Sequence, residues 1–312
     1  MLFQVLDYRN ECVGLFCEGE ILKDVPKSLS KTWKYCTYLP ANIEYASLYC
    51  DNLPLDAACP EHLRSQWQSV SNKMRSFMVS FQEAKVSLDD NCFFDLVPSN
   101  FLVDYFHVKN LITEHVFENY AKPKNYDFLL SLTKFVEAVK QRPLNIDKRF
   151  NIQKSQDVKI AKFLKNNQNK KHIDYNVFGT KTGRLTTKKN SFPILTFEKQ
   201  FRSVLKPNND WFLEFDYNAA ELRVMLGLLG KEQPQEDLHE WNLKNIYKDA
   251  CTREEAKKRT FAWLYNPESK DHLLDKEYDR EALLTKYWNG THVKTCFDKE
   301  IEADKHHALN YI

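Results

Sequence analysis

The sequence predicts an α+β fold in which amphipathic helices accompany several short strands. Three stretches between residues 61 and 142 carry apolar residues at steps of three and four, which indicates helices. Residues 211–216 alternate between two sets of side chains with a period of two, which indicates a strand. Of the 312 residues, 43% are hydrophobic and 13% aromatic. The chain can therefore bury a sizeable core, and we expect two or three subdomains.

Residues 1–60 are predicted to form a small β-rich unit. The segments FQVLDY and ECVGLFCEGEIL make two strands around a turn at Arg9 and Asn10, and residues 33–39 are a candidate third strand. The eight cysteines of the chain show neither a CxxC pair nor a metal-ligand spacing. We therefore expect most of them to be reduced thiols.

Residues 61–142 are predicted to be a helical subdomain. The first helix covers residues 61–84, and the second is capped by Ser99 or Asn100 and ends before the KPKN at 122–125. The third helix covers residues 127–141, and a short strand at 143–147 follows it.

Positive charge is concentrated in residues 148–189. This stretch contains twelve Lys and Arg residues against Asp157 and Asp174, a local net charge of +10. Since the whole chain carries only +2, the remainder carries −8. Such an asymmetry is typical of a face that binds a polyanion such as nucleic acid, although a solvated surface is the simpler alternative.

The stretch 211–223 reads as a buried strand that ends in an acid and continues into a helix. Asn218 is the expected N-cap of that helix. Asp216 then lies at the tip of the strand, next to the backbone carbonyl of Tyr217. Two such oxygen donors suit Mg²⁺ and the phosphates of a substrate. The alternative is that Asp216 merely begins a turn.

A second helix is predicted to begin at residue 253, because Thr252 and Glu255 have the spacing of a capping box. Four residues then recur four apart on one stripe, two cations followed by two aromatics: Arg253, Lys257, Phe261 and Tyr265. Other residues of this helix, Ala256, Thr260, Trp263 and Leu264, are expected to pack behind the stripe. Cations near a helix N-terminus oppose the helix dipole, and bound phosphates would relieve this. The alternative is that the stripe has no ligand, with its cations on a solvated surface and its aromatic residues in the core.

These two stretches resemble motifs A and B of the family A DNA polymerases, the bacterial polymerase I family. DYNAAELR at 216–223 is similar to motif A, and the stripe of 253–265 is similar to motif B. The resemblance implies that Asp216 and Lys257 are catalytic and that Asp216 and Tyr217 bind metal. It also implies nucleotide contacts for Tyr217, Glu221, His239, Arg253, Lys257, Phe261 and Tyr265, with Glu221 excluding the ribose 2′ hydroxyl. Alanines at 219 and 220, and Ala262 and Asn266 in place of glycines, depart from the family pattern.

Four weaker resemblances extend the match over residues 145–312. TKTGRLTT at 180–187 is similar to the segment from which the family reaches the primer end, which implies DNA contacts for Arg184, Lys181, Lys188 and Lys189. DLH at 237–239 resembles the start of the fingers and gives His239 its place near the triphosphate. GTHVKT at 290–295 resembles a family strand, and residues 303–312 resemble the helix that precedes motif C, with Asn310 near the primer–template pair.

The resemblance implies a right-hand polymerase. We expect a β-rich unit at 1–60, a thumb-like helical region at 61–142, a palm with motif A at 143–230, fingers with motif B at 231–300, and the start of the return to the palm at 301–312. The β-rich unit stands where the family often carries a proofreading exonuclease. The first strand of that exonuclease normally carries an Asp-x-Glu pair. Here Asp7 is followed by Tyr8 and Arg9, so the Glu is missing, and an inactive remnant or an unrelated cap is expected.

The expected function is template-directed DNA synthesis with primer–template DNA, dNTPs and two Mg²⁺ ions. Motif C, which supplies the second metal-binding carboxylate in the family, is not in the sequence. We therefore expect a second polypeptide that carries it, as in a split viral polymerase, or else a truncated sequence. A palm without motif C should expose an apolar seam. The alternatives are a catalytically inactive nucleic-acid-binding or scaffold subunit, and a single-subunit RNA polymerase, against which Glu221 argues.

The sequence also bears on location. No apolar run approaches the ~20 residues of a membrane span, and the amino terminus lacks a signal-peptide pattern. A cytoplasmic protein is expected, in the host cytoplasm if the protein is viral.

Overall fold

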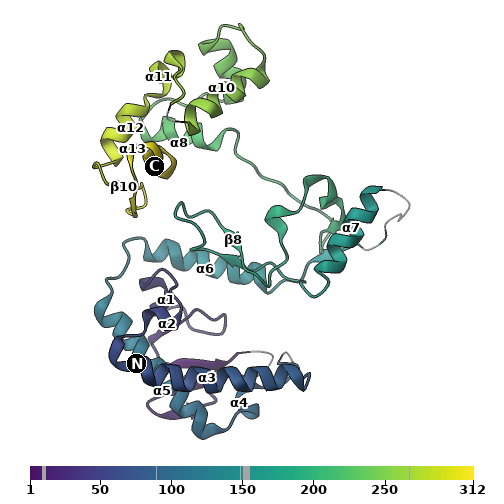
Figure 1. Cartoon of the computed structure of the whole chain (residues 1–312), viewed down its shortest axis with the longest axis vertical. Coiled ribbons are helices and arrows are strands. Elements are labelled where there is room, and N and C mark those ends of the chain that lie inside the picture. The colour runs from purple at the N-terminus through teal and green to yellow at the C-terminus, as the bar shows by residue number, and fades with distance from the viewer. Residues whose placement is uncertain (9–11, 89, 148, 150–154, 267) are drawn as a thin grey trace. The chain divides into compact units, whose positions relative to one another are not determined.

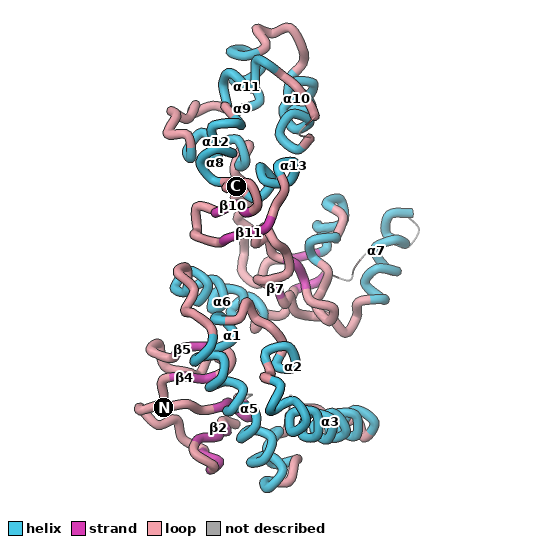
Figure 2. The backbone as a smooth tube through the Cα atoms, turned by 60° about the vertical axis from the view of Figure 1, so that its left-hand side comes forward, coloured by secondary structure: helices cyan, strands magenta, loops and turns pink. Residues whose placement is uncertain are grey.

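The computed structural model describes residues 1–8, 12–88, 90–147, 149, 155–266 and 268–312. Helices dominate, and the strands between them are short, as Figure 2 shows. This confirms the predicted α+β class. The chain divides into two compact units: the first comprises 1–143, 170–178 and 187–193, and the second comprises 144–169, 179–186 and 194–312.

A three-stranded antiparallel sheet opens the first unit. It consists of β1 (Gln4–Asp7), β2 (Gly14–Cys17) and β3 (Glu20–Leu22) in sequential order. The two predicted strands are thus confirmed, but the second divides in two where Glu18 and Gly19 adopt positive φ. The predicted turn at Arg9 and Asn10 lies outside the described residues.

The predicted strand at 33–39 is wrong. Trp33 and Cys36 bury their side chains three residues apart, which a strand of period two cannot do. The Leu39 amide instead donates to the Cys36 carbonyl at 3.2 Å and closes a turn. The strands nearby are β4 (Lys31–Thr32) and β5 (Glu44–Tyr45), which pair in parallel.

The three predicted helices of the first unit are confirmed. They are α3 (Glu61–Glu83), α5 (Ser99–Asn119) and α6 (Tyr126–Lys140). Pro98 holds the N-cap position of α5, not Ser99 or Asn100. Helices α3 and α5 lie side by side (Figure 1) and share apolar clusters that include Trp67 and Ile112. Three short helices complete the unit: α1 (Ala46–Tyr49), α2 (Leu55–Ala58) and α4 (Phe93–Leu96).

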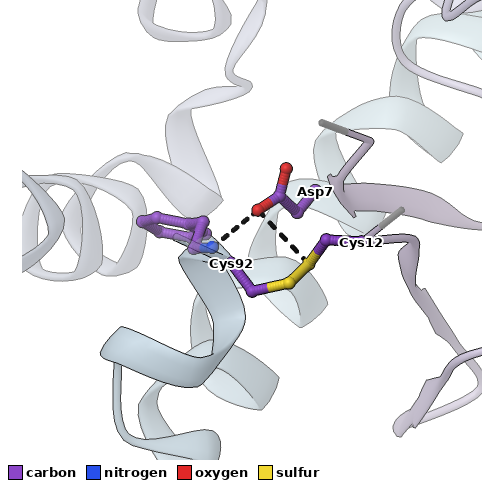
Figure 3. Close-up of a disulfide and its surroundings, with 4 residues drawn as sticks. Asp7, Cys12 and Cys92 are labelled. Carbon is purple, nitrogen blue, oxygen red and sulfur yellow. Dashed lines mark hydrogen bonds between the residues drawn. A yellow bond between two sulfur atoms is a disulfide. The ribbon is translucent and has the colours of Figure 1, made fainter. Parts of the chain in front are cut away.

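A disulfide joins Cys12 to Cys92, and the other cysteines are free, which confirms the expectation that most are reduced thiols. The fold brings the two Cα atoms to 5.8 Å although the residues are 80 apart in sequence, and nothing local in the sequence signals such a pairing. Asp7 lies beside the sulfurs, and its carboxylate accepts a 2.6 Å hydrogen bond from the Phe93 amide (Figure 3). The other six cysteines are free, and four of them are buried.

The second unit begins with a short antiparallel pair, β6 (Asn145–Ile146) with β9 (Leu205–Lys206), which confirms the strand predicted at 143–147. Between these strands lie α7 (Ser155–Asn166), β7 (Tyr175–Asn176), β8 (Thr186–Thr187) and two 3-10 helices, η1 (Ile194–Thr196) and η2 (Lys199–Val204). The first unit includes β7 and Thr187.

The remainder of the second unit is mostly helical and shares one core around Trp263, Leu274 and Tyr278. Its elements are α8 (Ala220–Leu228), α9 (Leu238–Trp241), the π-helix η3 (Asn242–Ile246), α10 (Arg253–Tyr265), α11 (His272–Tyr278) and α12 (Arg280–Tyr287). The hairpin of β10 (His292–Lys294) and β11 (Glu300–Glu302) follows, then α13 (Lys305–Ala308) and η4 (Leu309–Tyr311). The strand predicted at 290–295 is therefore confirmed, and the helix predicted at 303–312 is confirmed in part, as a short α-helix followed by a 3-10 turn.

The buried strand predicted at 211–216 is wrong. Residues 211–217 are in neither a strand nor a helix, and their side chains face solvent: Trp211 is 78% exposed and Phe215 90%. Figure 1 shows the ribbon here as a single extended segment before α8. Alternating side chains fit a strand, but a strand also needs a hydrogen-bonded neighbour. None of the described strands pairs with this segment.

None of the helices within the described ranges combines the length and apolar character required to cross a bilayer.

Candidate functional site

Helix α10 begins as predicted. The Thr252 hydroxyl accepts from the Glu255 amide at 3.3 Å, and the Glu255 carboxylate accepts from the Thr252 amide at 2.8 Å, which completes the capping box. The four residues expected behind the stripe are all buried: Ala256, Thr260, Trp263 and Leu264. This packing fixes the rotation of α10 about its axis, so the residues of the predicted stripe lie outside its buried face.

The stripe of α10 brings a cation and two aromatic rings into contact. The Lys257 ammonium lies 5.9 Å from the centre of the Phe261 ring, and the rings of Phe261 and Tyr265 stack at 6.0 Å. The ring of His239, from α9, lies 5.5 Å from that of Phe261. No carboxylate of the described residues is within ion-pair distance of Lys257, so its charge is open to a ligand.

His239 is buried, with 4% of its surface exposed. Its Nδ1 has no hydrogen-bond partner among the described residues. Burial lowers the pKa of His239, the positive charges of Lys257 and Arg253 lower it further, and Asp237 opposes them. At neutral pH the ring is therefore uncharged. An anion placed between these groups would reverse the balance and favour the protonated ring.

Arg253 is held by carboxylates. Its guanidinium donates to Asp237 at 2.8 Å and to Glu254 at 3.1 Å. Burial alone would raise the pKa of Asp237, but hydrogen bonds from Arg253, the Glu240 amide and Asn218 lower it to about 2. A phosphate that binds Arg253 must therefore compete with an ionised Asp237.

Asn218 does not cap α8, as the sequence predicted. The N-cap residue is Ala219, whose positive φ of 51° places it in the left-handed region immediately before the helix. The Asn218 side chain instead accepts from the Leu238 amide at 2.8 Å and donates to Asp237 at 2.6 Å. It thus ties the turn before α8 to the start of α9.

Residues from separate motifs meet at Glu221, on the first turn of α8. The Tyr265 hydroxyl donates to Glu221 Oε1 at 2.9 Å, and the Arg184 guanidinium donates to the same oxygen at 3.3 Å. Burial raises the pKa of Tyr265, and the Glu221 carboxylate raises it further, so the phenol keeps its proton at neutral pH. These three residues and Asn310 line one cavity of about 310 Å³, whose other walls are apolar.

Asp216 and Tyr217 lie on the exposed segment before α8. Their oxygens are donors of the kind that Mg²⁺ accepts. Within the described ranges, Asp216 belongs to no group of three His, Cys, Asp or Glu side chains near enough to share an ion. The one such group found there is Asp7, Cys12 and Cys92, whose sulfurs are joined to each other. Asp216 and Tyr217 can thus offer part of a metal shell.

The four predicted DNA-binding residues of the 181–189 stretch are divided between the two units. Arg184 and Lys181 belong to the second unit, where the Lys181 carbonyl accepts from the Lys299 ammonium at 3.2 Å. Lys188 and Lys189 belong to the first unit, where Lys188 pairs with Asp174 at 2.9 Å.

Asp237 has a structural part in this site that the sequence motifs did not indicate. This residue caps α9 by accepting from the Glu240 amide at 2.9 Å and also holds Asn218 and Arg253. An acid three residues before Glu240 is an N-cap signal that could have identified it.

No model of a known protein family matches this chain, and no curated protein sequence matches it either.

Proposed function

We propose that this chain is the part of a template-directed DNA polymerase that binds the incoming nucleotide. One observation carries the proposal: Arg184, Glu221, Tyr265 and Asn310 line a single cavity although they come from four separate sequence motifs. Each motif resembles family A on its own, and nothing in the resemblance of one motif requires contact with another in this chain. Their meeting supports one nucleotide site.

The stripe of α10 that ends at Tyr265, one of the residues lining this cavity, suits a deoxynucleoside triphosphate. Lys257, Arg253 and His239 supply positive charge, or the capacity to take it up, on one side of α10, and phosphoryl transfer depends mainly on such positioning and charge. Phe261 offers a ring face to the base and sugar. Glu221 fills space beside Tyr265 where a ribose 2′ hydroxyl would need room. To bind the triphosphate, the Arg253 guanidinium gives up its hydrogen bond to Asp237 and donates to a phosphate instead.

The proposal includes Mg²⁺ and a second polypeptide. Two Mg²⁺ ions would stabilise the attacking and leaving oxygens of the reaction. Asp216 and the Tyr217 carbonyl are the donors that this chain offers, and a second carboxylate would come from the partner. The exposed apolar residues of 211–217 support a partner, because a monomer rarely leaves such a patch in water.

One observation favours a second candidate, a catalytically inactive nucleic-acid-binding or scaffold subunit. Within the described ranges, no cluster of three potential ligands includes Asp216. In such a subunit the cavity would still bind nucleotide or DNA, but Asp216 would have no role in a reaction.

Primer extension with matched variants tests the proposal. The chain is assayed with a polypeptide, encoded next to it, that bears a His–Asp turn between two apolar strands. Asp216→Asn should abolish incorporation and leave primer–template affinity within about twofold, because phosphate contacts dominate DNA binding. Glu214→Gln, two residues away on the same exposed segment, is the matched control and should retain both properties.

Three outcomes decide between the candidates. Loss of incorporation in Asp216→Asn alone supports the polymerase. Equal extension by Asp216→Asn and the unaltered chain overturns the role of Asp216. DNA binding without incorporation by any combination of chains favours the inactive subunit.

A further inference from the structure

The first unit contains a cleft that is separate from the residues of α8 and α10. It has a volume of about 790 Å³. Its lining includes lysines, a histidine and two tyrosines, among them Tyr38, Lys140, His172, Lys188 and Lys189. All of these residues belong to the first unit.

Backbone hydrogen bonds hold the two segments that form one wall of the cleft. The Lys188 amide donates to the Asp174 carbonyl, and the Phe192 amide donates to the His172 carbonyl, both at 2.9 Å. Phe192 is fully buried and anchors the second segment. The ring of His172 in turn donates from Nδ1 to the Lys140 carbonyl at 2.9 Å, which ties this wall to the last turn of α6. The lysines therefore stand on ordered backbone.

Positive charge exceeds negative charge at this cleft. Asp174 lies 2.9 Å from the Lys188 ammonium and 3.7 Å from that of Lys140, so one carboxylate serves two cations. Lys140 also lies 3.7 Å from Glu137. These bridges are partly exposed and stabilise the fold only weakly.

Lys34 adds a further cation to this group. Although its side chain is exposed overall, loss of water around the ammonium lowers the pKa of Lys34, and the charges of Lys188 and Lys140 lower it further. Lys189 also lines the cleft. The ammonium groups of Lys34, Lys140 and Lys188 thus repel one another, and Asp174 and Glu137 offset part of their charge. A polyanion would relieve their mutual repulsion.

We propose that this cleft binds a single strand of nucleic acid, with the lysines on its phosphates and the ring of Tyr38 against a base. Tyr38 is 52% exposed, and an aromatic face beside lysines is the usual arrangement for binding single strands without sequence preference. The volume exceeds the needs of one phosphate and falls within the range of roughly 300–1,000 Å³ found for ligand sites. The proposal thus assigns Lys188 and Lys189 a common role with Lys140 and Lys34, all of the first unit.

This inference goes beyond the proposed polymerase, because none of its residues lines the cavity at Glu221. A strand held here could be template or product. Its test needs neither a second polypeptide nor nucleotide incorporation, so binding at the cleft and polymerase activity can fail independently.

Fluorescence anisotropy with a labelled oligothymidylate and the full chain tests the proposal. Lys140→Gln with Lys189→Gln should weaken binding about 25-fold at 0.1 M salt, since each lost phosphate contact on a single strand costs roughly fivefold there. The slope of log K against log salt should fall by about 1.4. Tyr38→Ala should weaken binding about tenfold, whereas Tyr38→Phe, which keeps the ring, should bind like the unaltered chain.

The matched control is Lys23→Gln with Lys27→Gln, two exposed lysines of the same unit that do not line the cleft. The control should bind within about twofold of the unaltered chain, and thermal melting verifies that every variant is folded. Equal losses in control and cleft variants would show a diffuse charge effect and overturn the proposal. So would unchanged binding in the cleft variants, a preference for duplex, or competition by inorganic tripolyphosphate together with no effect of Tyr38→Ala.

Discussion

The hydroxyl of Tyr265 donates a 2.9 Å hydrogen bond to the carboxylate of Glu221 and so joins α10 to α8 across 44 residues of sequence. Both residues line the cavity that Arg184 and Asn310 also reach. The raised pKa of Tyr265 keeps the phenol protonated, so this bond persists at neutral pH. The contact gives Glu221 a fixed position, which its proposed role of selecting between sugars by size would require.

The first prediction concerns that selection. In the assembled enzyme, Glu221→Ala should reduce the preference for dNTP over rNTP by about tenfold or more, equivalent to about 1.4 kcal/mol, because the space beside Tyr265 is opened. Glu221→Gln keeps the size of the side chain and an oxygen that can accept from Tyr265. It should therefore retain most of the preference. The measurement is kcat/KM for each nucleotide on one primer–template, and equal discrimination by all three proteins would remove Glu221 from this role.

The second prediction concerns the protonation of His239. In the free chain its pKa should lie below 6.5, because the ring is buried and faces Lys257 and Arg253. Tripolyphosphate should raise that pKa, since it brings negative charge to the same place. Nuclear magnetic resonance of the histidine side chains during a pH titration, with His239→Gln to assign the signal, measures both values.

The sign of the effect on stability follows from the same shift. Well above pH 6.5 the ring is neutral in both the folded and the unfolded chain, so His239 does not make the free energy of unfolding depend on pH there. As the pH falls below 6.5, the unfolded chain takes up the proton first, so the free energy of unfolding decreases. His239→Gln should lose this part of the pH dependence. A pKa for His239 that tripolyphosphate leaves unchanged would contradict the proposed place of this residue near the triphosphate.

The third prediction concerns the disulfide. Cys12 and Cys92 are 80 residues apart, so their bond restricts a long loop of the unfolded chain. Replacing both by Ser should lower the free energy of unfolding of the first unit by roughly 2–4 kcal/mol under oxidising conditions. With a thiol reductant the difference from the unaltered chain should vanish. Urea unfolding followed by circular dichroism gives the values, and Cys296→Ser, at an exposed free cysteine, is the control.

The sequence predicts best those features whose determinants are local. Helices α3, α5, α6 and α10 were predicted within one or two residues, because a stripe of apolar residues and a capping box lie within the helix itself. The burial of Trp263 behind the stripe of α10 follows from the same spacing. Which side chains of α10 are buried and which form the stripe could therefore be predicted from the sequence of this helix alone.

Features that depend on distant partners were not predictable in this way. The alternation of 211–216 suggested a strand, but a strand forms only where another strand accepts its hydrogen bonds, and sequence periodicity does not reveal that partner. The Cys12–Cys92 disulfide and the hydrogen bond from Asn218 to Asp237 were not predictable for the same reason, because each joins residues that are far apart in sequence. Motif resemblance suggested which residues share a site, and the cavity at Glu221 is where four of them meet.

The last prediction concerns the exposed segment 211–217. Trp211, Leu213 and Phe215 are between 78% and 90% exposed and occupy alternate positions, so an added strand would meet them on one side. The chain alone should self-associate through these residues, because exposed apolar side chains on an unpaired extended backbone invite pairing. Replacing all three by Ser should suppress self-association and leave the helical content unchanged, since none of them belongs to the core.

Light scattering after size-exclusion chromatography measures the association, first for the chain alone and then with the co-expressed partner. With the partner, the triple variant should form no stable heterodimer. Phe212→Ser, which alters the opposite side of the same segment, should keep it. The partner should restore extension only to chains that bind it, because in the proposed polymerase the partner supplies the second carboxylate next to Asp216. If the triple variant and the unaltered chain bind the partner equally well, the binding surface for the partner lies elsewhere on the molecule.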